Sequence, residues 1–180
     1  MDKGLKIEGK KIYLRAADVS DATDVYVSWL NDPEVNQYLE IRFSTHTIAD
    51  ARAYITKYTN DENTLLLAII RKDTNTHIGN IKLGPINPHH KYAEMALMIG
   101  DKSSWSRGFA SEAITLLAQY AFTMLGVHKI IAGAYRNNIG SIKVFQKCGF
   151  SIEYIRKSQY LYNGKYIDAI VLTLFNESPT

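Results

Sequence analysis

The chain has little of what usually marks an extracellular or membrane protein. Of its 180 residues only Cys148 is a cysteine, which excludes a disulfide within the chain. No apolar run reaches the length needed to span a membrane, and residues 1–11 lack the charged-then-apolar pattern of a signal peptide. We therefore expect a cytoplasmic protein that does not associate with a membrane.

Other absences narrow the range of partners and architectures. The 21 Lys and Arg residues form no basic block and the net charge is only +3, so nucleic acid is not expected as a partner. A modest positive charge does suit a polyanionic cofactor. No repeat, low-complexity tract or Pro- or Ser-rich linker interrupts the sequence. Residues 1–180 are therefore expected to form a single domain with a substantial core.

Periodicity predicts the elements of this domain. Alternating or continuous apolar stretches indicate strands, and spacings of three and four residues indicate helices. Gly84 and Pro85 are expected to end the strand that starts at His77. The adjacent His89 and His90 lie in a loop without a third ligand, so no metal is expected. The expected strands are residues 10–15, 64–71, 77–83, 92–99, 128–135, 151–162 and 165–174, and the expected helices are residues 20–29, 47–58, 108–125 and 139–148, with bounds that are approximate.

A short polar turn precedes a long amphipathic run in residues 104–122. Small and apolar side chains recur there at the helix period, and the helix is expected to begin between Arg107 and Ala110. The first amides of a helix have no carbonyl partners and lie at the positive end of its dipole, so they suit an anion such as a pyrophosphate. Gly108 would let that anion approach the backbone. An ordinary glycine-containing junction between a loop and a helix would have the same appearance.

A second motif occupies residues 137–150. Asn137, Ser141 and Phe145 are spaced one helical turn apart and would share one face of a helix. Gly149 follows as a left-handed residue that ends this helix. The hydroxyl of Ser141 could bond the backbone carbonyl four residues earlier.

One carboxylate interrupts an otherwise apolar strand. Residues 92–99 are expected to form a buried strand in which Glu94, Ala96 and Met98 share a face. Burial disfavours the charged form of a carboxylate and raises its pKa toward neutrality, the range that suits a general base. Glu94 is therefore the candidate base. It could instead lie at a solvated strand end or pair with a Lys or Arg.

These segments resemble a known family. W-S-R-G-F-A-S-E-A, residues 105–113, resembles motif A of the GNAT acyl-CoA N-acyltransferases in the form found in the RimJ/RimL-like branch. N-N-I-G-S-I-K-V-F-Q-K-C-G-F, residues 137–150, resembles motif B. The resemblance implies the GNAT fold, an α/β (α+β) fold with a mixed, mostly antiparallel central sheet flanked by helices. It also implies transfer of an acetyl group from acetyl-CoA, as co-substrate, to an amine.

The resemblance also implies roles for individual positions. In this family the amides of the motif A turn hold the pyrophosphate of acetyl-CoA. The central strand splays from its neighbour to admit the pantetheine arm, and it often carries a catalytic Glu, here Glu94. Backbone amides near Leu97 would stabilise the oxyanion. The residues expected to contact acetyl-CoA are Leu97, Met98, Ile99, Arg107, Gly108, Phe109, Ala110, Ser111, Asn137 and Lys143.

The chain departs from the family at one catalytic position. Phe145 stands where many members have a Tyr that protonates the departing CoA thiolate. Phenylalanine has no proton to give, so Ser141 or solvent would take that role, as in RimL-like members without the Tyr. The missing Tyr slightly favours a non-catalytic acyl-CoA-binding module, whereas Glu94 favours an enzyme.

The acceptor is expected to be a primary amine of a small molecule. W-L-N-D-P-E-V-N-Q-Y-L, residues 29–39, looks like the corresponding segment of acetyltransferases that act on nucleotide-linked amino sugars, and a tyrosine-rich hairpin surrounds Asp168. These residues could also simply pack or form salt bridges. The RimJ/RimL resemblance suggests a protein N-terminus as the alternative acceptor, and the protein could form a homodimer. The residues expected to bind the acceptor are Trp29, Asn31, Asn36, Tyr38 and Asp168.

Overall fold

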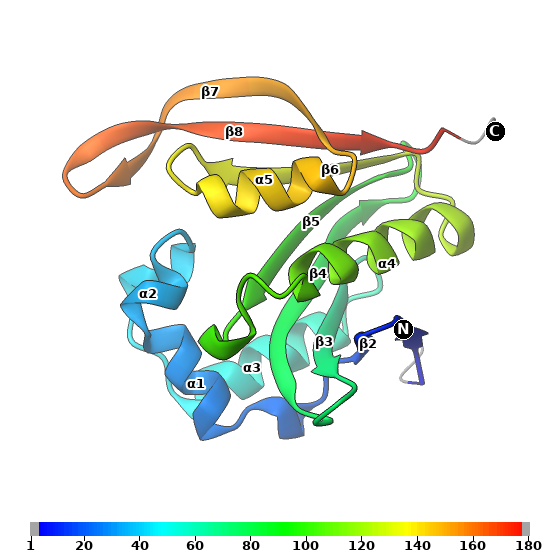
Figure 1. The fold of residues 1–180 in the computed structure, drawn as a ribbon, viewed down its shortest axis with the longest axis vertical. Helices are drawn as coiled ribbons and strands as arrows, with labels where there is room; N and C mark the ends of the chain where they lie inside the picture. Colours follow the sequence, from blue (N-terminus) through cyan, green and yellow to red (C-terminus); the bar gives the residue numbers. More distant parts are fainter. Residues whose placement is uncertain (1–3, 178–180) are drawn as a thin grey trace.

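A computed structural model describes residues 4–177, which form one eight-stranded sheet with helices packed against it (Figure 1). The strand order is β1-β2-β3-β4-β5-β6-β8-β7. Neighbouring strands are antiparallel except β5 and β6, which are parallel. The mixed, mostly antiparallel sheet expected from the sequence is thereby confirmed.

The bounds of most elements agree with the expected ranges. The strands are β1 (Lys6–Glu8), β2 (Ile12–Ala16), β3 (Leu65–Arg71), β4 (His77–Asn87), β5 (Tyr92–Ile99), β6 (Lys129–Tyr135), β7 (Ser151–Tyr162) and β8 (Lys165–Phe175). The helices are α1 (Asp24–Asn31), α2 (Pro33–Asn36), α3 (Ile48–Thr59), α4 (Phe109–Met124) and α5 (Ile139–Lys147), with short 3-10 helices η1 (Val19–Asp21), η2 (Glu40–Phe43) and η3 (Lys102–Ser104).

Each face of the sheet has its own hydrophobic cluster. The larger cluster includes Leu65, Leu67 and Ile69 of β3 with residues of α4 and α5. The smaller one includes Leu66 of β3 with residues of α1 and α3. Because side chains alternate along a strand, a strand covered on both faces needs a continuous apolar run, and β3 has one.

The sheet opens between β5 and β6. Their parallel pairing extends only from Tyr92 to Glu94 on β5, whereas β5 pairs with β4 as far as Ile99. Figure 1 shows β5 running away from β6 beyond this point. The second half of β5 therefore has a partner strand on one side and a gap on the other.

One strand end differs from expectation. β4 does not stop at Gly84 and Pro85 but continues to Asn87. Its pairing with β5 shifts between Leu83 and Ile86, and such a bulge accommodates a proline that cannot donate to the ladder. Past the bulge, Ile86 N donates to Asn63 O at 2.7 Å. The proline therefore interrupts the ladder without ending the strand.

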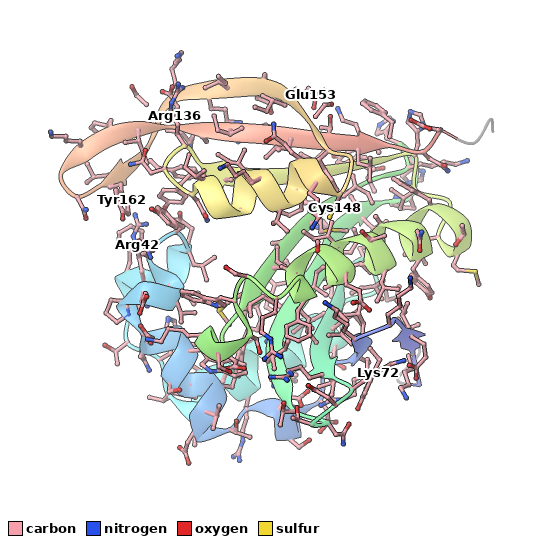
Figure 2. All side chains as sticks on the ribbon, in the orientation of Figure 1. Arg42, Lys72, Arg136, Cys148, Glu153 and Tyr162 are labelled. Atoms are coloured by element: carbon pink, nitrogen blue, oxygen red, sulfur yellow. The ribbon has the colours of Figure 1, made fainter. Side chains whose placement is uncertain are left out.

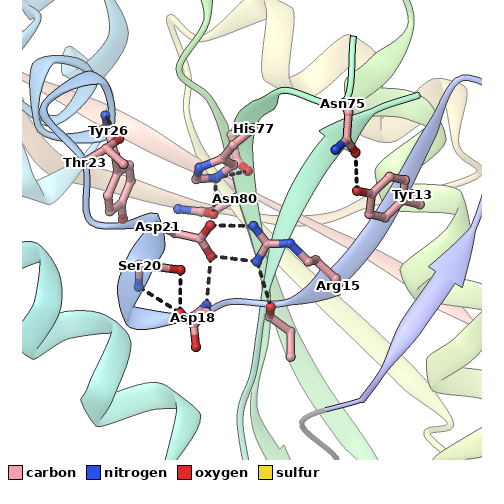
Figure 3. Close-up of polar contacts among 12 residues, drawn as sticks. Tyr13, Arg15, Asp18, Ser20, Asp21, Thr23, Tyr26, Asn75, His77 and Asn80 are labelled. Atoms are coloured by element: carbon pink, nitrogen blue, oxygen red, sulfur yellow. Dashed lines mark hydrogen bonds and ion pairs between the residues drawn. The ribbon is translucent and has the colours of Figure 1, made fainter. Parts of the chain in front are cut away.

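A polar network joins β2, η1 and β4 beneath α1 (Figure 3). Arg15 donates to the carboxylate of Asp21 at 2.8 Å, which also accepts from Asp18 N. Burial opposes the charge of Asp21, but these hydrogen bonds outweigh it and lower its pKa. Burial also lowers the pKa of His77, whose ring lies 2.9 Å from Asn80 Oδ1. The network fixes the start of α1 against the sheet.

Gly79 on β4 lies where a side chain has no room. A Cβ at this position would overlap the carbonyl oxygen of Met98 on β5. We expect Gly79→Ala to lower the free energy of unfolding by about 2 kcal/mol, because the two central strands must separate to admit the methyl group. Gly133→Ala on β6 is the control, since a Cβ there would meet nothing within 4 Å. Equal losses in urea unfolding of the two variants would contradict this account.

Candidate active site

The turn before α4 has the geometry of an anion-binding site. Gly108 is the N-cap of α4, with φ 85° and ψ 4°, a left-handed conformation that favours glycine. Having no side chain, Gly108 leaves the first amides of the helix open to an external anion. A Cβ on Gly108 would meet only Ser111 Oγ at 3.9 Å and Lys11 Nζ at 4.0 Å. The backbone here can be approached closely, as a pyrophosphate requires.

A cavity of about 450 Å³ extends from this turn between the end of β5 and the start of α5. We call it the cofactor cavity. It is large enough for part of a CoA molecule. Of the residues predicted to contact acetyl-CoA, those that line it are Leu97, Met98, Ile99, Gly108, Phe109, Ala110 and Ser111; Ser141 and Tyr38 line it as well.

Three predicted contacts lie outside its lining. Arg107 and Lys143 are exposed. Asn137 was expected on one face of α5, but that helix begins at Ile139 and Asn137 precedes it. Asn138 takes its place, lining the cavity and accepting from Ser141 N at 3.1 Å.

Phe145, which replaces the family's Tyr, is buried in the larger hydrophobic cluster. Its ring packs edge-on against Phe150 with centroids 5.0 Å apart. This position therefore contributes packing and no proton. The Ser141 hydroxyl is the side-chain donor that α5 brings to the cofactor cavity.

The backbone of β5 turns some of its amides into the gap. Gly100 N donates to Ile78 O of β4 at 2.9 Å. The carbonyl of Ile99 faces the other way and accepts from Trp105 Nε1 at 2.8 Å. Because successive peptide groups of a strand point to opposite sides, Leu97 has the same orientation as Ile99. The Leu97 N–H therefore points away from β4 and into the gap.

A second cavity, of about 360 Å³, lies on the side of the sheet covered by α1 and α3. We call it the acceptor cavity. It shares Leu39, Leu97 and Met98 with the cofactor cavity, so the two meet at the splayed part of β5. Its polar lining, which sequence reasoning missed, consists of Tyr26, Glu40, His46, Asp50, Tyr54, Asn80 and Lys82.

Tyrosines connect the acceptor side to the β7–β8 hairpin. Tyr135 stacks on Tyr160 with centroids 4.0 Å apart, and Tyr38 stacks on Tyr162 at 5.3 Å. Tyr135 Oη donates to Glu40 Oε1 at 2.6 Å. Burial, together with this carboxylate, raises the pKa of Tyr135 to about 12. The phenol therefore remains protonated and holds Glu40 in place at neutral pH.

Arg42 completes this connection. Its guanidinium donates to Leu161 O at 2.8 Å and to Gln37 O at 2.6 Å. It also lies over the ring of Tyr162 (Figure 2). The segment after α2 is thus tied to the hairpin across the open end of the gap.

Glu94 is exposed, so its expected burial is wrong. The side chains of β5 alternate, with Ala93 and Met95 in the larger cluster and Glu94 on the opposite face. Glu94 is the last residue of β5 paired with β6, and its charge acts on Tyr160 and Arg156 of β7. It therefore lies where the gap begins, on the same face as Met98.

Four residues predicted to bind the acceptor have contacts within the protein, and two of them, Asn31 and Asn36, also line a third cavity of about 970 Å³. Trp29 is buried and packs against Gly100. Asn31 Nδ2 donates to His46 O at 2.8 Å, and Asn36 Nδ2 donates to Leu30 O at 2.8 Å. Trp29 is thus a core residue, and the two amides brace the loops around α1 and α2.

Asp168 is the fourth predicted acceptor-binding residue with contacts inside the protein. Its carboxylate pairs with Arg136 at 3.0 Å and Lys157 at 3.3 Å and accepts from Ser158 N at 3.1 Å. On β8 it shares a face with Ile170, which belongs to the larger cluster. Asp168 is therefore on the opposite face of the sheet from the acceptor cavity.

Within residues 4–177 no group of three or more His, Cys, Asp or Glu side chains is placed to hold a metal ion. In the same range, no helix has the length and apolar character needed to cross a membrane.

Comparison with known proteins identifies the family. The family described as acetyltransferase (GNAT) domain matches residues 11–151. An N-acetyltransferase named p20 from Bacillus licheniformis is 30% identical over 168 residues, covering 92% of this chain and 93% of that protein. A spermidine N(1)-acetyltransferase from Escherichia coli is 31% identical over 97 residues, or 54% of this chain and 52% of that protein.

A solved structure has the same fold. Spermidine N-acetyltransferase from Vibrio cholerae in complex with CoA and spermine superposes with a TM-score of 0.82 at 22% identity, covering 93% of this chain and 96% of that chain. The chain therefore belongs to the GNAT acetyltransferase family. Its enzyme class, an N-acetyltransferase with acetyl-CoA as co-substrate, is confirmed.

Proposed function

We propose that this enzyme acetylates a primary amine of a small molecule that carries at least one further amino group. The observation that carries the proposal is the meeting of the cofactor cavity and the acceptor cavity at Leu39, Leu97 and Met98. An acetyl group held in one cavity and an amine held in the other would meet at the open side of β5. Such positioning supplies much of the rate enhancement in acyl transfer.

The proposed reaction uses the backbone amides of two segments and the side chains of Glu94 and Ser141. Acetyl-CoA supplies an activated acetyl group. The amides after Gly108 would hold its pyrophosphate, and the Leu97 N–H would stabilise the oxyanion. Glu94, directly or through a water, would take a proton from the acceptor amine. Ser141 or solvent would supply the proton that leaves with the thiolate.

The charges of the acceptor cavity support a polycationic amine. Glu40 and Asp50 line it, against a single lysine, Lys82. Tyr54 and Tyr26 add ring surface that can lie against an alkyl chain or an ammonium group. The spermidine N-acetyltransferases named above act on a substrate of this class, which agrees with the charge pattern.

The other acceptors suggested by the sequence have less support. A nucleotide-linked amino sugar would need free ring faces, yet Trp29 is packed in the core and the hairpin residues Tyr160 and Tyr162 stack on tyrosines of other segments. A protein N-terminus, which the RimJ/RimL resemblance suggests, would need an open groove. A cavity of about 360 Å³ has a size that suits a small molecule.

Glu40→Gln tests the acceptor. We expect KM for a triamine such as spermidine to rise about tenfold, while KM for a simple monoamine stays unchanged, because only the longer substrate brings a second ammonium group to Glu40. The measurement is thiol release from acetyl-CoA with both amines. Tyr135→Phe, which removes the partner of Glu40 but keeps its charge, should retain the preference for the triamine.

The same assay decides between the alternatives. Turnover on N-terminal peptides or on nucleotide-linked amino sugars, with none on polyamines, would overturn the proposed acceptor. Slow hydrolysis of acetyl-CoA with every amine would instead favour an acyl-CoA-binding module.

A further inference from the structure

Lys11 lies beside the turn that precedes α4, although the two are far apart in sequence. Its Nζ donates to the carbonyl oxygen of Arg107 at 3.2 Å and lies 4.0 Å from the place a Cβ on Gly108 would occupy. No ion pair found among residues 4–177 includes Lys11. The first turn of α4 thus has a lysine ammonium group next to its open amides.

The backbone around Lys11 is fixed to α4 by Glu112. Glu112 Oε1 accepts from Lys11 N at 2.9 Å and from Ile12 N at 3.5 Å. Gly9 lies close against α4, since a Cβ on Gly9 would overlap this carboxylate and the side chain of Leu116. Because the carboxylate of Glu112 is engaged with backbone amides, it holds the strand start in place while the Lys11 ammonium extends toward the turn.

Two arginines also lie near the turn. Arg71 pairs with Asp73 through Nε at 3.0 Å, and its guanidinium lies 5.2 Å from the centre of the Phe109 ring. The guanidinium of Arg107 lies 5.5 Å from the same ring. Among these three cations, Lys11 is the one for which residues 4–177 provide neither a carboxylate partner nor a ring contact.

We propose that Lys11 binds a phosphate group of CoA and that Glu112 positions it to do so. An anion at the open amides of α4 would come within reach of Nζ, and a lysine ammonium is a compact charge well suited to phosphate. The inference rests on the proposed placement of the cofactor at this turn. It adds the segment between β1 and β2 to the cofactor site.

Lys11→Met tests the proposal in a binding measurement that does not depend on turnover. Calorimetric titration with CoA at low ionic strength should show affinity lower by about five- to tenfold, and high salt should shrink the difference because it screens the charge. Lys10→Met is the matched control, since Lys10 is adjacent and also exposed. Equal affinities of the two variants and the parent protein would overturn the proposal.

Two further titrations sharpen the assignment. A loss of affinity that persists with dephospho-CoA, which lacks the 3′-phosphate, assigns Lys11 to the pyrophosphate. A loss confined to CoA assigns it to the 3′-phosphate.

Glu112→Ala should weaken binding in the parent but add little in the Lys11→Met background, because both substitutions act through one contact. Additive losses would contradict the positioning role. Unchanged binding by Gly108→Val would show that the turn itself is not the cofactor site.

Discussion

Glu94→Gln should lower kcat by about 10²-fold or more while CoA affinity and the fold remain unchanged. The side chain lies where β5 and β6 part, on the face of the sheet that also carries Met98 and the acceptor cavity. Glutamine keeps the size of the side chain but cannot accept a proton.

The measurements are steady-state kinetics across pH and calorimetric titration with CoA. Glu153→Gln is the control, since Glu153 is another strand carboxylate, paired with Lys129 at 2.6 Å on the far edge of the sheet. It should leave kcat unchanged. Full activity of the Glu94 variant would remove this residue from the mechanism and leave deprotonation of the amine to solvent or to another group.

Gly108→Val should weaken acetyl-CoA binding at least about tenfold, or ~1.4 kcal/mol. The valine side chain would enter the open space beside the amides of α4, where the pyrophosphate is proposed to lie. The left-handed φ of 85° adds backbone strain to this steric effect. Calorimetric titration measures the affinity, and thermal unfolding measures the cost in stability.

Gly126→Val separates the two contributions. Gly126 has a φ of 63°, and a Cβ there would meet nothing within 4 Å, so its variant carries comparable strain in a place remote from the turn. It should lose stability but keep CoA affinity. If both variants bind CoA as the parent does, motif A has been misread, and the cofactor site lies elsewhere.

Local patterns were sufficient to predict most elements and the turn before α4. The helix period after Gly108 and the apolar run of β3 are properties of short segments, so neighbouring residues determine them. The bulge at Pro85 was not predictable in this way, because the pairing of β4 with β5 determines whether the strand continues past a proline.

The acceptor side shows the limit of such patterns. Trp29 looked like a binding residue in an aromatic segment, but contact with Gly100 makes it part of the core. Glu40 and Asp50 gave no signal, because they converge on one cavity only when the segments around η2 and α3 fold over the sheet. Burial and convergence depend on residues distant in sequence.

By itself, the sequence determined the class of fold, the start of α4 at Gly108 and the isolation of one carboxylate on β5, since each depends on residue types within a few positions. Only the tertiary structure decided that Glu94 is exposed where β5 and β6 separate, that Asn138 and not Asn137 lines the cofactor cavity, and that Lys11 reaches the turn before α4. The physical reason is that solvent exposure, register and contacts across the sheet arise from the packing of distant segments, which local periodicity does not encode.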